Sequence, residues 1–404
     1  MSKKLKIPTL RFKEFFGEWE EKKLEDIAKF SKGKSISKSD IVEDGILECI
    51  RYGELYTHYK ETINEIYSKT NLDKNDLVVS EYGDIIIPAS GETQIDIATA
   101  SCVLKDGVAL SGDLNIIKTD EDGVFLSYYL NNAKKYDIAR LSQGISVVHL
   151  YSSQLKLLKL NLPQKQEQEK IASFLSSIDK KIEQLSKKDE LLESYKKGVM
   201  QKIFNQEIRF KADDGSDYSD WEEKKLGDLI KESKEKSTSS GQHEVLSSTK
   251  DNIVLQSEYF NREIASKDNT GYKILRIHQL VFSPQNLWLG NINVNTKYEV
   301  GIVSPSYKIY DFRDSILVNY GKYFLKTPRM MYEYAQASEQ GASVVRRSLN
   351  IDLFNLIKIS LPCIEEQIKI ANFLSSLDTK ISQNKKTLEE TQKFKKALLQ
   401  QMFV

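Results

Sequence analysis

LPQKQEQEKIASFLSSIDKKIEQLSKKDELLESYKKGVMQKIF, residues 162–204, contains no proline after Pro163 and a single glycine, Gly198. Most of its positions carry Lys, Glu, Asp, Gln or Ser. Apolar side chains recur along it at every seventh position, namely Ile171, Ile178, Leu185, Leu192 and Val199. So narrow an apolar stripe predicts a helix that packs through one face, as in a coiled coil, with a length of roughly 60 Å.

The same pattern returns at the end of the chain, as LPCIEEQIKIANFLSSLDTKISQNKKTLEETQKFKKALLQQMF, residues 361–403. Pro163 aligns with Pro362 and Phe204 with Phe403 at one constant offset. The word IASFLSSIDKKI returns as IANFLSSLDTKI. Two copies of so long a pattern at one offset indicate an internal duplication.

The beginnings of the two halves are repeated as well. LRFKEFFGEWEEKKLEDI, residues 10–27, returns at 208–229 as IRFKADDGSDYSDWEEKKLGDL. Each half therefore begins with RFK and ends with a long helix, and two halves predict a pseudo-twofold molecule. The middle of each half is rich in short strands broken by Gly, Asp and Asn, with one further helix expected at 125–141 and at 320–338. Each half is thus expected to hold a mixed α/β domain with a shared frame and a divergent centre.

Composition excludes few functions. The chain has 404 residues, enough for two or three domains. Its 59 Lys and Arg nearly balance its 58 Asp and Glu, so any basic surface must be local. Three widely spaced cysteines suggest a reducing compartment, and no apolar run suits a signal peptide or a membrane span. We therefore expect a cytoplasmic protein.

Catalytic motifs are not recognisable in the sequence. The 19 glycines include no GxG pair, and Ala28 stands where a phosphate-binding loop ending in Gly33-Lys34-Ser35 needs its first glycine. No proline is followed by Pro or Asp, which removes the simplest methyltransferase and nuclease signatures. The four histidines lack the spacing of metal ligands. The expectation is a non-catalytic module with no metal and no cofactor of its own.

These features together resemble the specificity subunit of type I restriction–modification systems. The resemblance rests on the RFK…WEEKKL starts, on two divergent domains, and on the helix words LPQKQEQEKIASFL and LPCIEEQIKIANFL. SEYGDIIIPASGET and VGIVSPSYKIYDF also resemble segments common in the recognition domains of that family. The resemblance covers essentially the whole chain.

The resemblance implies an α+β fold with two target recognition domains separated by two long antiparallel coiled-coil helices. The boundaries then follow chain order: a first recognition domain at 1–162, a central spacer helix at 163–206, a second recognition domain at 207–361 and a C-terminal spacer helix at 362–404. The pairing of the two helices would use the apolar stripe and its flanking residues. Partner docking is likewise expected on the helices, and the residues assigned to them are Ile171, Phe174, Ile178, Leu185, Leu192, Ile370, Phe373, Leu377 and Leu388.

The resemblance also implies a function. Each domain would read one half of a bipartite double-stranded DNA site. Two modification subunits would bring S-adenosylmethionine and the methyl-transfer site, and two motor–nuclease subunits would bring ATP and Mg²⁺ and cut unmodified DNA. Two rival interpretations are a coiled-coil adaptor that binds only proteins, and an enzyme whose carboxylate site lies in the variable domains.

Amides, guanidinium groups and hydroxyls on loops are the groups that read bases and grip phosphates. In the first domain this criterion selects Arg51, Tyr52, Glu54, Ser90, Glu92, Thr93, Gln94 and Gln143. In the second it selects Ser283, Gln285, Asn286, Trp288, Asn291, Asn293, Arg346 and Arg347. For any single one of these residues an ordinary surface-loop role is an equal alternative.

The apolar stripe becomes polar at two positions of the second helix, since Thr391 stands where the first copy has Leu192. Asn384 stands where the first copy has Leu185. A buried Asn would fix the pairing register of the helices at some cost in stability, and a solvent-facing Asn would do neither. The sequence leaves both open.

Overall fold

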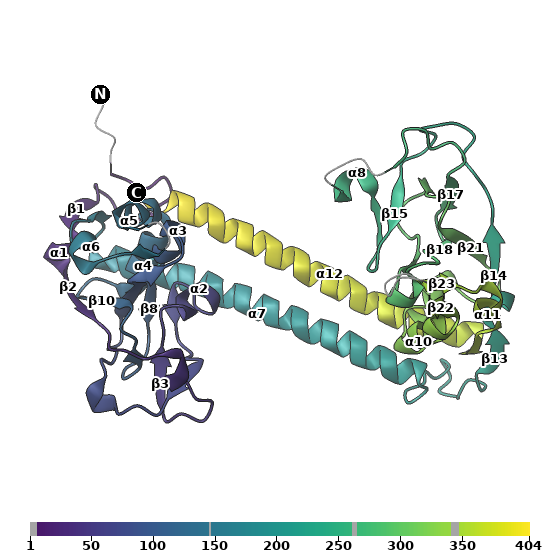
Figure 1. Ribbon diagram of the computed structural model, residues 1–404, viewed down its shortest axis with the longest axis horizontal. Coiled ribbons are helices and arrows are strands. Elements are labelled where there is room, and N and C mark those ends of the chain that lie inside the picture. The colour runs from purple at the N-terminus through teal and green to yellow at the C-terminus, as the bar shows by residue number, and fades with distance from the viewer. Residues whose placement is uncertain (1–5, 145–146, 261–264, 341–346) are drawn as a thin grey trace. The chain divides into compact units, whose positions relative to one another are not determined.

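The computed structural model describes residues 6–144, 147–260, 265–340 and 347–404. The chain divides into two compact units (Figure 1). The first unit comprises Met1–Lys187 and Lys386–Val404, and the second comprises Lys188–Lys385. Each unit therefore contains one strand-rich domain together with part of each long helix.

The long helices are α7 (Lys165–Phe204) and α12 (Ile364–Gln401), within three residues of the predicted bounds. In the first unit the beginning of α7 shares a core with the end of α12. In the second unit the end of α7 shares a core with the beginning of α12. The two helices are therefore antiparallel, as the resemblance implied.

In the first unit the strands are short. They are β1 (Glu20–Lys23), β2 (Ala28–Lys32), β3 (Leu47–Ile50), β4 (Thr62–Ile63), β5 (Ser68–Thr70), β6 (Asp84–Pro88), β7 (Ser90–Gly91), β8 (Ser101–Val103), β9 (Ala109–Leu110), β10 (Leu114–Thr119), β11 (Val148–His149) and β12 (Lys159–Leu162). The helices are α1 (Leu24–Ile27), α2 (Glu54–Thr57), α3 (Gln94–Ile97), α4 (Gly123–Asn132), α5 (Lys135–Leu141) and α6 (Ser152–Leu155), with 3-10 turns η1 (Lys38–Asp40) and η2 (Lys74–Asp76).

The second unit has a similar series of elements. Its strands are β13 (Glu222–Lys225), β14 (Ile230–Ser233), β15 (Leu246–Ser248), β16 (Ile253–Leu255), β17 (Lys273–Arg276), β18 (Leu280–Phe282), β19 (Ile292–Val294), β20 (Val300–Val303), β21 (Lys308–Phe312), β22 (Ser338–Gln340), β23 (Arg347–Leu349) and β24 (Lys358–Leu361). Its helices are α8 (Gln256–Tyr259), α9 (Val318–Phe324), α10 (Pro328–Gln336) and α11 (Ile351–Leu356), with 3-10 turns η3 (Leu226–Asp228) and η4 (Leu287–Leu289).

The main sheets of the two units share their topology. The first has the order β2-β10-β6-β8-β4 and the second has the order β14-β21-β18-β19. The repeated word WEEKKL forms β1 and β13, which pair antiparallel with the strands that lead into the long helices, β12 and β24. The duplication visible in the sequence is therefore a duplication of the sheet and of its connection to a helix.

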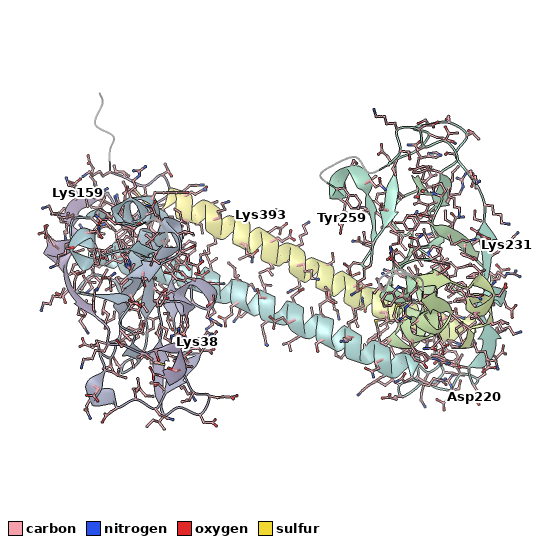
Figure 2. The ribbon with its side chains drawn as sticks, viewed as in Figure 1. Lys38, Lys159, Asp220, Lys231, Tyr259 and Lys393 are labelled. Carbon is pink, nitrogen blue, oxygen red and sulfur yellow. The ribbon has the colours of Figure 1, made fainter. Side chains whose placement is uncertain are left out.

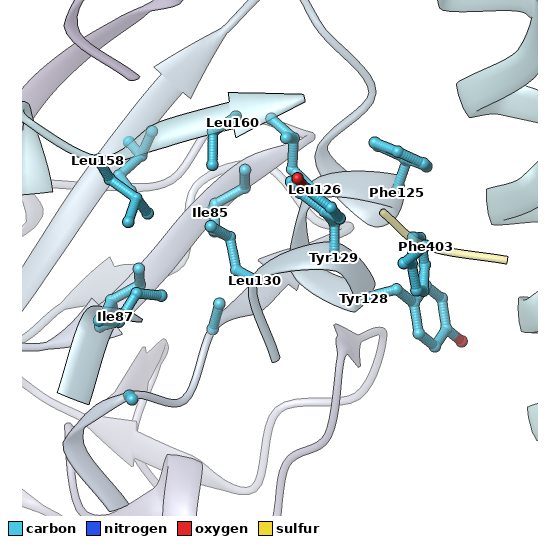
Figure 3. Packing of buried hydrophobic residues seen from close by; sticks show 14 of the residues in the cluster. Ile85, Ile87, Phe125, Leu126, Tyr128, Tyr129, Leu130, Leu158, Leu160 and Phe403 are labelled. Carbon is cyan, nitrogen blue, oxygen red and sulfur yellow. The ribbon is translucent and has the colours of Figure 1, made fainter. Parts of the chain in front are cut away.

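The core of the first unit lies between its sheet and its helices (Figure 3). Ile85 and Ile87 of β6 face Leu126 and Tyr129 of α4 in one buried cluster. Phe403, just beyond α12, packs edge-on against the ring of Phe125 at 5.7 Å. The apolar end of a helix from the second repeat thus completes the core of the first domain.

The second unit repeats this arrangement with the helix from the first repeat. Phe204, the last residue of α7, lies 5.8 Å from the ring of Tyr320 and 5.7 Å from that of Phe324. Burying an aromatic side chain in this way stabilises the packed state by roughly 1.5–3 kcal/mol. Each domain is therefore closed by the helix of the other repeat.

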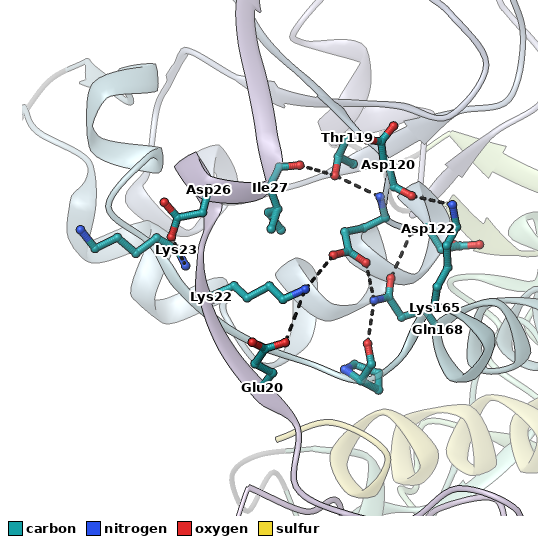
Figure 4. A network of polar contacts seen from close by, with 12 residues as sticks. Glu20, Lys22, Lys23, Asp26, Ile27, Thr119, Asp120, Asp122, Lys165 and Gln168 are labelled. Carbon is teal, nitrogen blue, oxygen red and sulfur yellow. Dashed lines mark hydrogen bonds and ion pairs between the residues drawn. The ribbon is translucent and has the colours of Figure 1, made fainter.

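A Glu-Gln pair lies in the first turn of each long helix, as Glu167-Gln168 in α7 and Glu366-Gln367 in α12. The glutamine of this pair has a structural role, which Figure 4 shows for Gln168. The side-chain amide of Gln168 donates to Glu121 Oε2 at 2.7 Å and to the Pro163 carbonyl at 2.9 Å, and its oxygen accepts from the Asp122 amide at 3.1 Å. Gln367 makes the equivalent bonds in the second unit, to the Pro362 and Ser315 carbonyls and from the Leu317 amide. These bonds fix the point where each long helix leaves its domain.

Each predicted single helix after the sheet is in fact a pair of helices. Residues 125–141 form α4 and α5, and the amides of Ala133 and Lys134 both bond to the Tyr129 carbonyl where the first helix ends. Residues 320–338 form α9 and α10, which Pro328 separates because proline suits the first turn of a new helix and Thr327 caps it. The prediction of one continuous helix was wrong in both domains.

Candidate nucleic-acid interface

In the first domain the structure brings several predicted residues into one chain of contacts. The ring of Tyr52 lies 6.4 Å from that of Tyr56, whose hydroxyl donates to the Ser90 carbonyl at 3.0 Å. Ser90 pairs with His149 across β7 and β11, and His149 exchanges two backbone bonds with Gln143. Tyr52, Ser90 and Gln143, from three distant parts of the sequence, therefore line one edge of the domain.

The backbone of this edge is closely fitted. A methyl group added at Gly91 would lie 2.9 Å from the Tyr56 hydroxyl, so any larger residue there would displace the Tyr56 side chain. Burial raises the pKa of Tyr56 well above its ordinary value, so the hydroxyl remains a donor at neutral pH. The loop that carries Ser90 is thereby held in one position against the turn that carries Tyr52.

Glu54 and Thr93 are occupied by local bonds. The Glu54 carboxylate accepts from the Arg51 amide at 3.0 Å and from the Ser68 hydroxyl. Thr93 caps α3, since its hydroxyl accepts from the Asp96 amide and donates to the Asp96 carboxylate. Glu92 and Gln94 on either side of it are exposed. These two exposed residues are better placed to meet a ligand than the capped or bonded ones.

In the second domain the strongest geometric pair is Trp288 and Arg347. The guanidinium group of Arg347, in β23, lies 4.5 Å above the centre of the Trp288 ring, which belongs to η4. One of its terminal nitrogens donates to the Ala335 carbonyl at 3.4 Å. Arg346 lies outside the described residues. A guanidinium stacked on indole is held in a fixed plane, which suits bidentate contact with phosphate or guanine.

The segment from the end of β18 into β19 holds the other predicted residues, with unequal exposure. Gln285 is exposed, Asn286 is half-buried, and Ser283 is buried at the end of the strand. Asn293 is also buried, and its amide donates to the Ser248 hydroxyl at 2.7 Å and to the Thr249 carbonyl at 2.8 Å. Asn291 donates to the Ser248 carbonyl at 2.9 Å. The two asparagines therefore tie this segment to β15 and the turn after it.

A half-buried lysine, Lys326, also contacts this segment. Lys326 donates to the Asn293 side-chain oxygen at 2.6 Å and to the carbonyls of Asp251 and Lys250 at 3.0 and 3.2 Å. Burial lowers its pKa to about 8. It lines a cavity of about 640 Å³ together with Lys196, Lys322 and Asp378. Because the ammonium group donates to three acceptors inside the domain, its role is structural.

The first-domain edge lined by Tyr52, Ser90 and Gln143 is held together by residues that were not selected from the sequence. Tyr56, His149 and Tyr151 were not selected, although the rings of His149 and Tyr151 stack at 6.1 Å. The available signal was SVVHLYSS, where two ring side chains, His149 and Tyr151, stand two positions apart shortly after the selected Gln143. Aromatic rings on a loop are surfaces on which bases or sugars can stack.

The residues assigned to the helices and to partner docking lie mainly inside the chain. Ile171, Ile178 and Leu185 of α7 are buried, as are Ile370 and Leu377 of α12. Phe174 packs edge-on against Phe12 at 5.6 Å, Phe373 packs against Phe210 at 5.7 Å, and Leu388 and Leu192 are half-buried. These side chains form the domain–helix and helix–helix cores, so docking on the helices, which stays a prediction, would use their other faces.

The described parts of the chain contain no group of three or more His, Cys, Asp or Glu side chains that could hold a metal ion. Among the helices described, none is long and apolar enough to cross a bilayer. The chemistry visible at both edges is that of binding: stacked rings, amides and a planar guanidinium group.

Comparison with known proteins agrees with this geometry. The family model for the type I restriction modification DNA specificity domain matches the chain twice, at residues 17–194 and 218–393. The chain therefore belongs to the type I restriction–modification specificity family. Members of this family give type I restriction–modification complexes their DNA sequence specificity.

Individual relatives extend over nearly the full chain. The type I restriction enzyme MjaVIII specificity subunit of Methanocaldococcus jannaschii is 25% identical, with 96% of this chain and 94% of that protein covered. The crystal structure of the type I restriction–modification S subunit from M. genitalium has a TM-score of 0.60 at 17% identity, covering 98% of this chain and 99% of that one. A chain from a structure of the type I R-M system, solved to study complex assembly and conformational transition, has a TM-score of 0.51 at 15% identity, covering 95% and 97%. The two structures share the fold described above.

Proposed function

We propose that this chain reads a bipartite DNA site, with one half-site recognised by each domain, and that it carries out no chemistry itself. The observation that carries the proposal is the contrast at the ends of two equivalent strands. Beyond β6 the first domain presents Ser90 held to Tyr56 and His149, and beyond β18 the second presents Trp288 stacked by Arg347. One frame with two unlike surfaces suits two readers of unlike sequence.

Methyl transfer and cleavage are assigned to partners. Two modification subunits would supply S-adenosylmethionine and the methyl-transfer site, and two motor–nuclease subunits would supply ATP and Mg²⁺. The chain itself would then need only to bind DNA and to hold the partners. The chain would bind double-stranded DNA in the cytoplasm, and no membrane would take part.

The long helices would set the distance between the half-sites. Each residue of helix adds 1.5 Å and each base pair spans 3.4 Å. A turn of helix therefore corresponds to roughly two base pairs of spacer. The spacer of the methylated motif should follow the length of α7 and α12.

The test is single-molecule sequencing of modified bases in host DNA with the gene present, deleted and restored. We expect a bipartite methylated motif that disappears on deletion and returns on complementation. An unchanged set of methylated motifs, in cells that express the methyltransferase subunit, would contradict the proposal. That outcome would favour the coiled-coil adaptor as the alternative, and co-purification would then identify its protein partners.

A further inference from the structure

One basic word is repeated within the otherwise divergent domains. Residues 29–35 read KFSKGKS and residues 231–237 read KESKEKS, so that three lysines and two serines recur at identical spacing. We name these the first and second lysine words. All six lysines are exposed: Lys29, Lys32, Lys34, Lys231, Lys234 and Lys236. Exposed positions are not needed for the core, so their repetition calls for a function common to both domains.

The two words occupy the same place in the fold. The first begins in β2 and the second in β14, and both strands form an edge of their sheets. Lys34 and Lys236 each lie just past the strand in an isolated bridge. Figure 2 shows Lys231 at the edge of its unit. In each sheet one strand separates the strand that carries the lysine word from the strand, β6 or β18, that precedes the candidate DNA-reading residues.

The positive charge of both words is available to a ligand. In the described parts of the chain, none of the six lysines forms an ion pair with a carboxylate. The second word contains two glutamates, but Glu232 is paired with Lys308 at 2.6 Å and Glu235 is paired through both oxygens with Arg276. The two glutamates thus pair with cations outside the lysine words and not with the lysines.

The first lysine word also lies next to the candidate reading residues of its domain. In the first unit the ammonium group of Lys32 lies 5.8 Å from the centre of the Tyr151 ring, which stacks on His149 beside Ser90. In the second unit the neighbourhood is basic, because Lys308 and Lys236 both help to lower the pKa of Lys273, whose main cause is burial. A duplex touching Ser90 and His149 would therefore meet Lys32, and the second word stands at the equivalent strand of its own sheet.

Strand geometry separates the lysines into two groups. Side chains two residues apart in an extended chain lie on the same face, about 6.6 Å apart, and side chains three apart lie on opposite faces. If the extended backbone of β2 and β14 continues to the isolated bridges at Lys34 and Lys236, Lys32 and Lys34 share a face, as do Lys234 and Lys236, while Lys29 and Lys231 point the other way. A spacing of 6.6 Å matches about two phosphates along one strand of DNA.

We infer that Lys32 with Lys34, and Lys234 with Lys236, form a repeated phosphate clamp that holds the DNA backbone beside each half-site without reading its sequence. The inference rests on the proposed function. It explains why the words are alike where the reading loops differ, since every half-site has the same backbone. Base contacts must change with the site, whereas phosphate contacts need not.

The test uses the chain assembled with its modification subunits, bound to a duplex that contains the methylated motif and to one that lacks it, over a series of salt concentrations. The variants are Lys32→Gln with Lys34→Gln, and Lys234→Gln with Lys236→Gln. The matched control is Lys29→Gln with Lys231→Gln, which removes the same charge from the other face. We expect each clamp variant to reduce the slope of log affinity against log salt by about 1.8, to weaken both duplexes equally, and to leave the methylated motif unchanged.

Any one of three results would contradict the proposal that these lysine pairs hold the DNA backbone. These are an unchanged salt slope, an equal change in the control, or an altered methylated motif. Increased aggregation with an unchanged slope would likewise overturn it, because edge-strand lysines also prevent sheets from pairing. If the unsubstituted complex shows no preference for any motif, the proposed function fails instead, whatever the variants do.

Discussion

At the scale of single residues, each half of the chain depends on one buried ion pair. Arg11 binds both oxygens of Glu167 at 2.7 Å, and Arg209 binds both oxygens of Glu366 at 3.2 and 2.7 Å. The two glutamate side chains are 1% and 0% exposed, and both lie in the first turn of a long helix, where negative charge is favoured. The Glu366 hydrogen bond raises the pKa of Arg209. The repeated RFK and EQ words are therefore two halves of one contact.

Removing Arg209 should leave the buried Glu366 carboxylate without its cationic partner, with the Trp221 indole still donating to it at 3.0 Å. We predict that Arg209→Gln lowers the unfolding free energy by about 3 kcal/mol, because a buried charge is then uncompensated. Denaturant unfolding measures this directly. Arg276→Gln is the matched control, since Arg276 makes the same two-oxygen contact with Glu235 at an exposed site and should change little. Equal effects of the two substitutions would contradict the account.

Lys326 should make stability depend on pH. Its pKa is lowered to about 8 by burial, so between pH 8 and about 10.5 the unfolded chain binds more protons than the folded chain. The unfolding free energy should therefore rise with pH in this window, by at most about 1.4 kcal/mol per pH unit. Denaturant titrations between pH 7 and 9.5 should show this rise in the natural chain and in Lys322→Met, and lose it in Lys326→Met. Parallel profiles for all three proteins would refute the assignment.

Single-residue roles were the hardest to predict from sequence. Glu54, Asn291 and Asn293 have the side chains of base readers, yet tertiary contacts use their polar atoms inside the domain. Arg347 and Trp288 were selected separately, and only the fold places one over the other. The sequence identifies the chemistry of a side chain but not the partners that long-range packing brings to it.

At the scale of elements, periodicity predicted the long helices and missed the breaks in shorter ones. The seven-residue apolar repeat located α7 and α12 within three residues of their bounds. Pro328 was a visible helix-start signal, so the break between α9 and α10 was predictable. The break between α4 and α5 was not, because the two asparagines before it are only weak helix breakers. Strong periodic patterns are reliable because many residues specify them together.

Asn384 is one of two polar residues within the apolar stripe of α12, and the structure decides between the two alternatives left open by the sequence. It is buried, and its amide lies 3.5 Å from Asp189 of α7. We predict that Asn384→Leu raises the unfolding free energy by about 1 kcal/mol, since the gain in apolar burial exceeds the loss of the long hydrogen bond to Asp189. The thermal midpoint should rise by roughly 3 °C.

Ser382→Leu is the control for Asn384→Leu, because Ser382 is exposed on the same helix and a leucine there buries little. A fall in stability for Asn384→Leu would show that the polar contact with Asp189 outweighs the apolar gain. The structural account of Asn384 as a costly register device would then be wrong.

At the scale of the whole molecule, the duplication was predictable and the reading surfaces were not. The repeated words predicted a shared frame around divergent centres, and the structure adds that the sheet order is also shared, as β2-β10-β6-β8 and β14-β21-β18-β19. Each domain is closed by the helix of the other repeat, through Phe403 and Phe204. The centres of the domains differ because no repeated pattern constrains them, so their loops had to be placed by the structure.

Lengthening both helices together should lengthen the spacer of the DNA site. We predict that seven residues inserted after Lys187 and seven after Lys386, which preserve the apolar repeat, increase the spacer by about three base pairs. Methylated-motif mapping of cells that carry the altered chain measures the spacer. An insertion in one helix alone is the control and should abolish methylation, because the stripes no longer match.

The central claim is that the two domains read their half-sites independently. The most direct measurement is methylated-motif mapping with chains altered in only one reading edge, with Tyr52→Ala and Gln143→Ala in the first domain or Trp288→Ala and Arg347→Ala in the second. The account predicts that each altered chain relaxes the sequence of one half-site and keeps the other half-site and the spacer. Loss of sequence preference in both halves from either alteration, with the altered chain still assembled with its partners, would contradict it.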